Sequence, residues 1–138
     1  MNSMIIKEYP SNLIVGVDFI DSQHKEIVEK IKNLIQIIES NGTIDEILES
    51  FDCFLNYVKY HFDTEETYFD LFNYKDKLRH IAAHQIFLNT LVELEKNYFE
   101  NPDKINESVL FFLEKWSNTH ILSLDLELAK ELIDNKIV

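Results

Sequence analysis

Residues that form turns and cross-links are scarce in this chain. Its 138 residues include two glycines, two prolines and one cysteine. Scarce turn formers beside abundant Leu, Ile, Glu and Lys argue against a fold of many short strands and favour long helices. The single cysteine, Cys53, cannot form a disulfide within the chain, which suits a reducing cytoplasm. We expect its side chain to pack as an ordinary part of the core.

The sequence also lacks the marks of a membrane protein, an exported protein or a nucleic-acid-binding protein. It contains no run of about 18 apolar residues. Its N-terminus, MNSMIIKEYPSN, has no basic region followed by an apolar one. A formal net charge of −12 at pH 7 disfavours binding to phosphate groups and to anionic membrane surfaces. These absences predict a cytoplasmic protein that binds neither nucleic acid nor membrane.

The first half of the chain contains two amphipathic helical patterns after an N-terminal arm. Residues 1–17 show no helical period, and we expect them to form an extended arm. Asp18 is expected to cap a first helix that ends in the turn at residues 40–42. Thr43 and Glu46 then form the capping-box pattern that opens a second helix. The two helices are therefore joined by a very short connection.

The second half of the chain contains two further helical patterns. The third helix is expected after the polar residues 73–77, and the fourth after Asn101 and Pro102, which resemble an N-cap and a first-turn proline. Four amphipathic helices with short connections predict an all-α fold, an up-down-up-down four-helix bundle. We expect one domain over residues 1–138, with the bundle at residues 18–135.

Histidine occurs where the apolar stripes of these helices predict core residues. His24, for example, precedes Ile27 and Val28 by three and four residues, on the face that turns inward. All five histidines and two carboxylates fall on predicted inward positions: His24, His61, Glu65, His80, His84, His120 and Asp125. Their positions alternate between early and late in successive helices, so an antiparallel bundle would gather them at one depth.

Two pairs of these residues have the spacing of neighbours on one helical face. His61 and Glu65, like His80 and His84, are four residues apart, about 40° around an α-helix. Each pair can therefore direct two donor atoms into the same space. A single inward histidine is more often a hydrogen-bonded core residue than a ligand. Seven such side chains at one depth instead favour a metal site.

The fourth helix departs from this spacing. His120 and Asp125 are five residues apart, which separates them by about 140° on a regular α-helix. The apolar stripe also slips by one residue there, because Trp116 and His120 fit one helical frame whereas Asp125 and Leu128 fit the next. We therefore predict a π-type bulge or a kink at residues 121–124, a feature often found at functional sites.

The donor types limit the choice of metal. Five imidazoles and two carboxylates are too many for one tetrahedral zinc ion. They suit two first-row ions that share carboxylates, although the donors alone do not separate iron from manganese or zinc. The sequence lacks the Glu-x-x-His repeats of ferritin-like carboxylate proteins.

The four segments that contain these residues resemble the four ligand segments of the hemerythrin family, in the same order and spacing. They are similar in particular to the single-domain bacterial hemerythrins, and the resemblance extends from about residue 15 to residue 132. The segments are VGVDFIDSQHKE (15–26), HFDTEE (61–66), HIAAHQIFL (80–88) and WSNTHILSLD (116–125).

The resemblance implies a cofactor of two iron ions with a bridging oxo or hydroxo group, and the reversible binding of dioxygen rather than an enzymatic activity. One iron would have three histidine ligands and be coordinatively full. The other would have two histidines and a position open for dioxygen, and two carboxylates would bridge the ions. The resemblance assigns His80, His84 and His120 to the full iron and His24 and His61 to the iron with the open position. Glu65 and Asp125 would be the bridging carboxylates.

Apolar residues next to the implied ligands are expected to keep the oxygen pocket dry. Ile27, Phe62 and Trp116 all lie within one helical turn of such a ligand. Ser117 follows the tryptophan at a position where many relatives have leucine. Because dry walls resist the entry of water and protons, we expect this serine to speed the oxidation of the irons.

Other functions remain open at this point. The same irons would suit an enzyme that reduces peroxide or nitric oxide, an iron-storage protein or a redox-sensing module. An enzyme would require a reductant, which the sequence does not identify. We expect the protein to be a monomer or a weak homo-oligomer.

Overall fold

The structure, a computed structural model, describes residues 11–100, 107, 111–112 and 115–138, without the side chains of residues 98–100 and 117–119. The first ten residues of the expected arm, and the predicted start of the fourth helix at Asn101 and Pro102, lie outside these ranges. Within them, the predicted four-helix bundle is confirmed.

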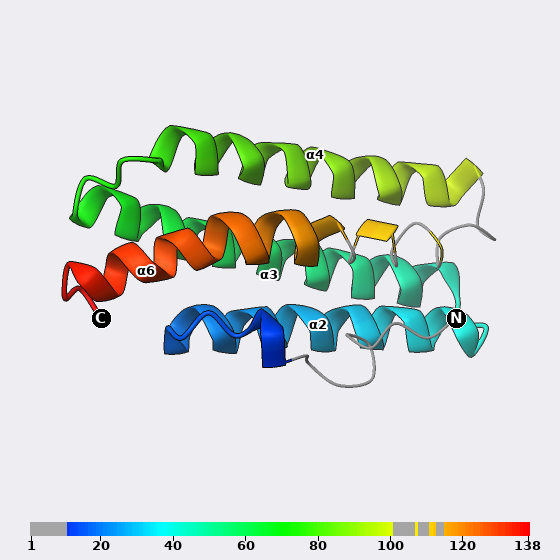
Figure 1. Cartoon of the computed structure of the whole chain (residues 1–138). Helices are drawn as coiled ribbons and strands as arrows, with labels where there is room; N and C mark the ends of the chain where they lie inside the picture. Colours follow the sequence, from blue (N-terminus) through cyan, green and yellow to red (C-terminus); the bar gives the residue numbers. More distant parts are fainter. Residues whose placement is uncertain (1–10, 101–106, 108–110, 113–114) are drawn as a thin grey trace.

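Helices that run in alternating directions make up the bundle (Figure 1). In that view α2 (Asp18–Glu39) and α4 (Lys77–Glu100) run from left to right, and α3 (Ile44–Leu71) returns between them. The fourth helix also returns, as a π-helical segment η3 (Trp116–Asp125) that continues directly into α6 (Leu126–Asp134). This alternation places the early part of α2 and α4 beside the late part of α3.

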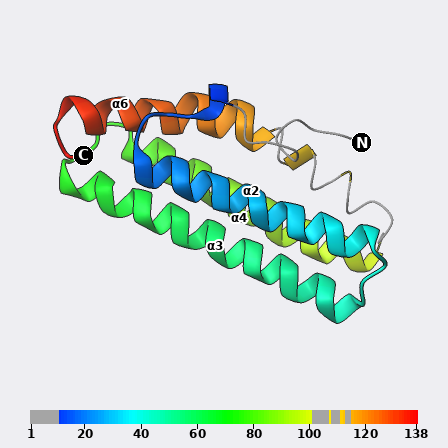
Figure 2. The same ribbon diagram turned by 90° about the horizontal axis from the view of Figure 1, so that it is seen from below.

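The helices pack against their neighbours in sequence around an apolar core. α2 contacts α3, α3 contacts α4, and α4 contacts η3. The 3₁₀ turn η1 (Ser11–Leu13) packs against η3, as seen from below in Figure 2. The largest fully buried side chains include Ile31, Leu34, Phe51 and Phe54, and burying each contributes about 1.5–3 kcal/mol. Across the described ranges, the structure contains no helix with the length and apolar character needed to cross a membrane.

The start of α2 differs from the prediction that Asp18 caps the helix. Val17, with extended backbone angles, is the N-cap, and it forms no side-chain capping bond. The helix start is instead tied to the arm through Asp21, whose carboxylate accepts hydrogen bonds from the backbone N–H groups of Val15 (2.8 Å) and Gly16 (3.0 Å). The prediction was wrong because it considered the helix alone, whereas the arm folds back over the first turn.

The start of α3 confirms the predicted capping box. The hydroxyl of Thr43 accepts a hydrogen bond from the backbone N–H of Glu46 (3.2 Å), and the Glu46 carboxylate accepts one from the N–H of Thr43 (2.9 Å). Two N–H groups that the helix cannot satisfy internally are thus paired. The box fixes where α3 begins.

Replacing Thr43 with alanine is expected to lower the free energy of unfolding by about 1 kcal/mol, because one helix-terminal N–H loses its acceptor. Urea denaturation of both proteins in the same metal-loading state measures the change. Thr64→Ala is a matched control, since the Thr64 hydroxyl bonds to the carbonyl of Tyr60 within the same helix and caps nothing. An equal loss of stability in both variants would contradict the capping role.

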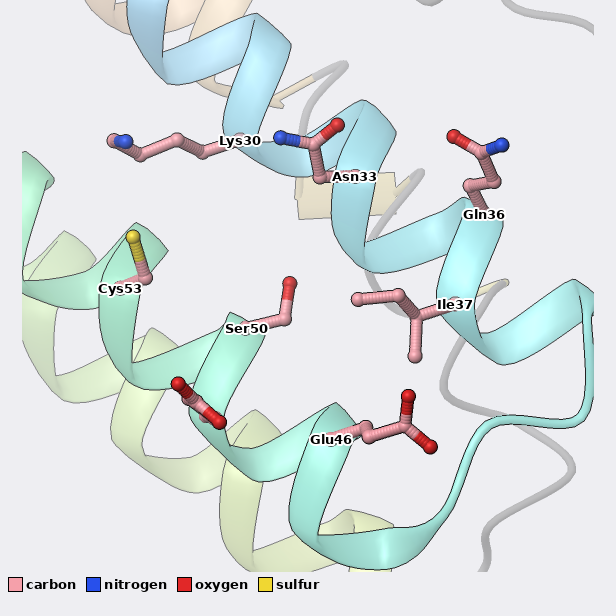
Figure 3. Close-up of a pocket in the computed structure, with 8 residues that line it drawn as sticks. Lys30, Asn33, Gln36, Ile37, Glu46, Ser50 and Cys53 are labelled. Carbon is pink, nitrogen blue, oxygen red and sulfur yellow. The ribbon is translucent and has the colours of Figure 1, made fainter.

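Cys53 is exposed, so the prediction that it packs in the core was wrong. It lies two residues after the buried Phe51 on α3, which turns it away from the inward face. Figure 3 shows its thiol in a surface groove where Cys53 and Ser50 of α3 lie opposite Lys30 of α2. The lining of this groove includes none of the histidines.

Candidate metal centre

The side chains that were predicted to face inward meet in one buried cluster. All five histidines, Glu65 and Asp125 have exposed fractions of 0%. His24 comes from the early part of α2, and His61 and Glu65 come from the late part of α3. The early part of α4 contributes two histidines, and η3 contributes the remaining histidine and Asp125. The antiparallel path therefore gathers polar side chains from all four helices in the interior of the bundle, toward the end where α3 connects to α4.

The cluster divides into two groups of potential metal ligands. Within each group, every residue offers one ligand atom, and these atoms all lie within 4.8 Å of one another. Both carboxylates belong to both groups, so the groups are adjacent and share two residues. One group is Glu65, His80, His84, His120 and Asp125; the other is His24, His61, Glu65 and Asp125.

Asp125 links the histidines of three helices. Its Oδ1 atom lies 2.9 Å from Nε2 of His80 and 3.2 Å from Nε2 of His120. Its Oδ2 atom lies 2.8 Å from Nε2 of His24, which belongs to the other group. The two oxygens of one carboxylate thus face the two groups separately, as a bridging ligand requires.

Glu65 occupies a similar position between the groups. Its Oε1 atom lies 3.0 Å from Nε2 of His84, 3.6 Å from Nε2 of His80 and 3.7 Å from Nε2 of His61. Two ligands at right angles around one ion, each about 2.1 Å away, are themselves about 3 Å apart. The separations in the cluster are therefore those of atoms that could share an ion.

A π-helical segment brings His120 and Asp125 to the same side of the fourth helix. The bulge predicted at residues 121–124 is confirmed, within a longer π-helical stretch, Trp116–Asp125. At its end the N–H of Leu126 donates to the carbonyl of Ile121, five residues earlier. In a π-helix the hydrogen bonds join residues five apart, so such residues lie on the same side of the helix. The wide turn therefore removes the separation that a regular α-helix would impose.

Several buried atoms of the cluster have no hydrogen-bond partner among the described residues, even though other polar atoms are close. Nε2 of His24, for instance, lies 2.8 Å from Oδ2 of Asp125, yet neither atom has a hydrogen-bond partner. Each unpaired buried group costs about 1–3 kcal/mol. The unpaired atoms that face the cluster are Nε2 of His24, His61 and His120, Oε2 of Glu65 and Oδ2 of Asp125.

The electrostatics of the cluster favour neutral imidazoles. Burial lowers the pKa of His61, His80 and His84 below the ordinary value of 6.5, and the neighbouring histidines lower it further. Neutral imidazole is the form of histidine that binds metals. These side chains are therefore in the metal-binding protonation state at neutral pH.

The two carboxylates have opposite tendencies. Burial raises the pKa of Glu65 well above 4.5, and the nearby carboxylate of Asp125 raises it further. Burial also opposes the ionisation of Asp125, but the surrounding histidines, His120 above all, hold its pKa well below the ordinary 3.8. The cluster therefore favours the neutral form of Glu65 and the ionised form of Asp125, and a cation between them would favour the ionised form of both.

Comparison with known families identifies this arrangement. Residues 15–132 match the family described as "Hemerythrin HHE cation binding domain". The chain belongs to the hemerythrin family. The resemblance predicted from the four ligand segments is confirmed, and the buried cluster is that of a cation-binding hemerythrin domain suited to two metal ions.

Curated relatives of this hemerythrin share about a quarter of its residues over most of the chain. A protein of Methylococcus capsulatus named "Bacteriohemerythrin" is 29% identical over 110 residues, which cover 80% of this chain and 83% of the relative. One of the same name from Pseudomonas aeruginosa is 28% identical over 119 residues, covering 85% and 75%. A "Hemerythrin-like protein" of Naegleria gruberi is 24% identical over 119 residues, covering 86% and 87%.

Two residues that contact the histidines of this hemerythrin were not predicted. Oε1 of Gln23 lies 2.7 Å from Nδ1 of His61, and Oε2 of Glu66 lies 2.8 Å from Nδ1 of His84. Each directly neighbours a predicted ligand in sequence, so a helical frame rotates it about 100° off the inward face. The sequence indicates only that each residue lies next to a ligand. Whether it contacts a histidine depends on how the neighbouring helix packs.

Two of the residues predicted to line an oxygen pocket, Trp116 and Phe62, pack against histidine rings. Trp116 meets the ring of His24 edge-on, with ring centroids 5.2 Å apart. Phe62 stacks on His84 at 3.8 Å, on the side of the cluster that holds three histidines. Ile27 is 1% exposed. The side chain of Ser117 lies outside the described residues.

Two further aromatic residues that were not predicted cover the group with three histidines. The ring of Phe69 lies 4.9 Å from that of His80, and the ring of Phe87 lies 5.0 Å from that of His120. Both occupy apolar positions of the helical stripes, where their sequence gives no sign of a role beyond packing. They add to the apolar shell that separates the cluster from water.

Proposed function

We propose that this hemerythrin holds two iron ions, bridged by an oxo or hydroxo group, and binds dioxygen reversibly. The observation that carries the proposal is the pair of buried ligand groups that share Glu65 and Asp125. The choice of iron rests on the family, because these donor types also suit manganese and zinc. The unpaired buried nitrogens and oxygens support a bound cation, since each would gain a partner.

The residues have separate roles in this proposal. Three histidines hold one ion, two histidines hold the other, and the two carboxylates bridge them. The ion at the three-histidine group would have one more protein ligand than the ion at the two-histidine group, which would leave the second ion more accessible to an external ligand. When bound, the iron pair supplies the electrons for reversible binding of dioxygen. The ligands are His80, His84 and His120; His24 and His61; and Glu65 and Asp125.

The surrounding side chains determine how well water is excluded. Trp116 contacts His24, which belongs to the group with the free position, and Ile27 is one helical turn from that histidine. Apolar walls slow the entry of water and protons, which would otherwise make oxidation of the irons irreversible. Their role is to keep binding of dioxygen reversible.

The test is to load the protein with ferrous iron without oxygen and record its visible spectrum while air is admitted. We expect an absorption band that appears with oxygen and disappears under vacuum, over several cycles. Irreversible bleaching in air, together with steady consumption of added peroxide or nitric oxide when a reductant is supplied, would instead indicate an enzyme. Ready loss of iron to a mild chelator would indicate storage, and either result would contradict the proposal.

Replacing Ser117 with leucine is expected to slow the decay of the oxygen-dependent absorption, because an apolar side chain after Trp116 would admit less water. The decay rates of the variant and the wild-type protein at the same temperature and pH measure the effect. Ser123→Leu, at an exposed position of the same helical segment, is the control. Unchanged decay in Ser117→Leu, or equal slowing in both variants, would argue against a role for this serine.

A further inference from the structure

We infer that Gln23 and Glu66 make the two halves of the centre unequal, so that the half with three histidines takes up the first metal ion. The inference rests on the proposed metal centre but not on its use of dioxygen. It gives both residues the role of positioning residues, which act on the metal through a histidine.

The contacts of Nδ1 distinguish two histidines from the other three. The Nδ1 atoms of His24, His80 and His120 are buried without a hydrogen-bond partner among the described residues. Those of His61 and His84 each have a close side-chain acceptor. One such histidine belongs to each ligand group. The outer contacts are therefore distributed one to each half of the centre.

Glu66 gives the larger half an anionic outer partner. Its carboxylate lies 2.8 Å from Nδ1 of His84, and Nε2 of the same ring faces Glu65 at 3.0 Å. A neutral imidazole carries one proton, and an acceptor on Nδ1 holds the proton there and leaves Nε2 free for a metal. The negative charge of Glu66 also makes the ring a stronger donor. His84 is thus both oriented and strengthened.

Gln23 gives the smaller half a neutral outer partner. Its side-chain oxygen lies 2.7 Å from Nδ1 of His61, and it is 9% exposed. This contact fixes the same tautomer as in His84 and directs Nε2 of His61 towards Glu65. A carboxamide carries no charge, so it adds little to the donor strength of the ring. His61 is oriented without being strengthened.

The two differences act in the same direction. The half that contains His84 has one more imidazole than the other half, and its outer partner is charged. Both features increase its affinity for a divalent cation. We therefore expect two metal ions to bind in two steps. The first ion binds at the group made of Glu65, His80, His84, His120 and Asp125.

Zinc is a suitable probe because it is diamagnetic and is not oxidised. The metal-free protein is titrated with zinc by calorimetry, and imidazole ¹⁵N spectra show which histidines are bound. We expect two steps, with the resonances of His80, His84 and His120 changing first. Glu66→Gln should weaken the first step by roughly tenfold to a hundredfold and leave the second unchanged. Gln23→Glu should strengthen the second step.

Asp63→Asn is the control for charge, because Asp63 is exposed one turn before Glu66 on α3 and its loss changes the net charge equally. It should leave both steps unchanged. If Glu66→Gln and Asp63→Asn behave alike, or if the wild-type protein binds its two ions in a single step, the inference is wrong while the metal centre stands. Failure of the wild-type protein to bind any zinc would overturn the metal centre as well.

Discussion

If the protein binds iron as we propose, replacing Glu65 with alanine is expected to remove most of that iron. Glu65 belongs to both ligand groups, so its loss takes one donor from each ion. It also removes a negative charge from the site that we propose holds two divalent cations, at 0% exposure to water. Loss of an outer partner alone lowers metal affinity by about 10- to 100-fold. We expect loss of a shared ligand to exceed that range.

Metal analysis after anaerobic loading and removal of free iron measures this effect. Asp63→Ala is the matched control, because Asp63 is an exposed carboxylate on the same helix, two residues before Glu65. His61→Ala is expected to give an intermediate result, since His61 belongs to one group and leaves the three-histidine group intact. Full retention of iron in Glu65→Ala or His61→Ala would refute the ligand role of the residue concerned.

Removing the metal is expected to lower the free energy of unfolding by about 4 kcal/mol when free metal had been present at about a thousand times its Kd. Metal that binds the folded chain and not the unfolded one stabilises the fold by this linkage. The cluster without metal also leaves several buried polar atoms unpaired. Denaturation with and without a chelator measures the difference, and equal midpoints would contradict the metal centre.

Glu65→Gln is expected to change the free energy of unfolding in opposite directions with and without metal. Burial and the carboxylate of Asp125 raise the pKa of Glu65 well above 4.5 in the folded chain. A raised folded pKa contributes stability below the unfolded pKa and loses it as pH rises through the folded pKa. Above that range the metal-free protein carries a destabilising buried charge, which glutamine removes.

Glu65→Gln should therefore stabilise the metal-free protein at neutral to alkaline pH and destabilise the metal-loaded one. Asp63→Asn, which removes the same charge at an exposed position, should have little effect in either state. Destabilisation by Glu65→Gln in both states would mean that Glu65 acts through packing and not through its charge.

The helical frames of the sequence are sufficient to predict the cluster, because it consists of residues that break an apolar stripe. His24 and Glu65 occupy positions where a leucine would be buried, and the structure buries both completely. The bulge of the fourth helix was predictable for the same reason, since the stripe shifts by one residue between His120 and Asp125. The helical period thus predicts, for each helix by itself, which side chains face the core.

Contacts that depend on a second element were not predictable in this way. Asp18 was expected to cap its helix, but Asp21 instead accepts hydrogen bonds from the backbone of the arm, whose path the helical period does not describe. Glu66 lies off the inward face of α3 and meets His84 because α4 packs at that side. The side-chain partners of a helix flank depend on packing between helices, which a single sequence does not specify.

The wide turn of the fourth helix determines which residues after it face the core. A π turn contains one residue more than an α-helical turn, so everything from Leu126 onward is rotated by about 100°. Leu128 and Leu132 are nevertheless completely buried. A chain one residue shorter would place His120, Asp125 and these leucines on one continuous α-helical seam. With the additional residue in place, the wide turn keeps Leu128 and Leu132 in the core and lets Asp125 face histidines of α2 and α4.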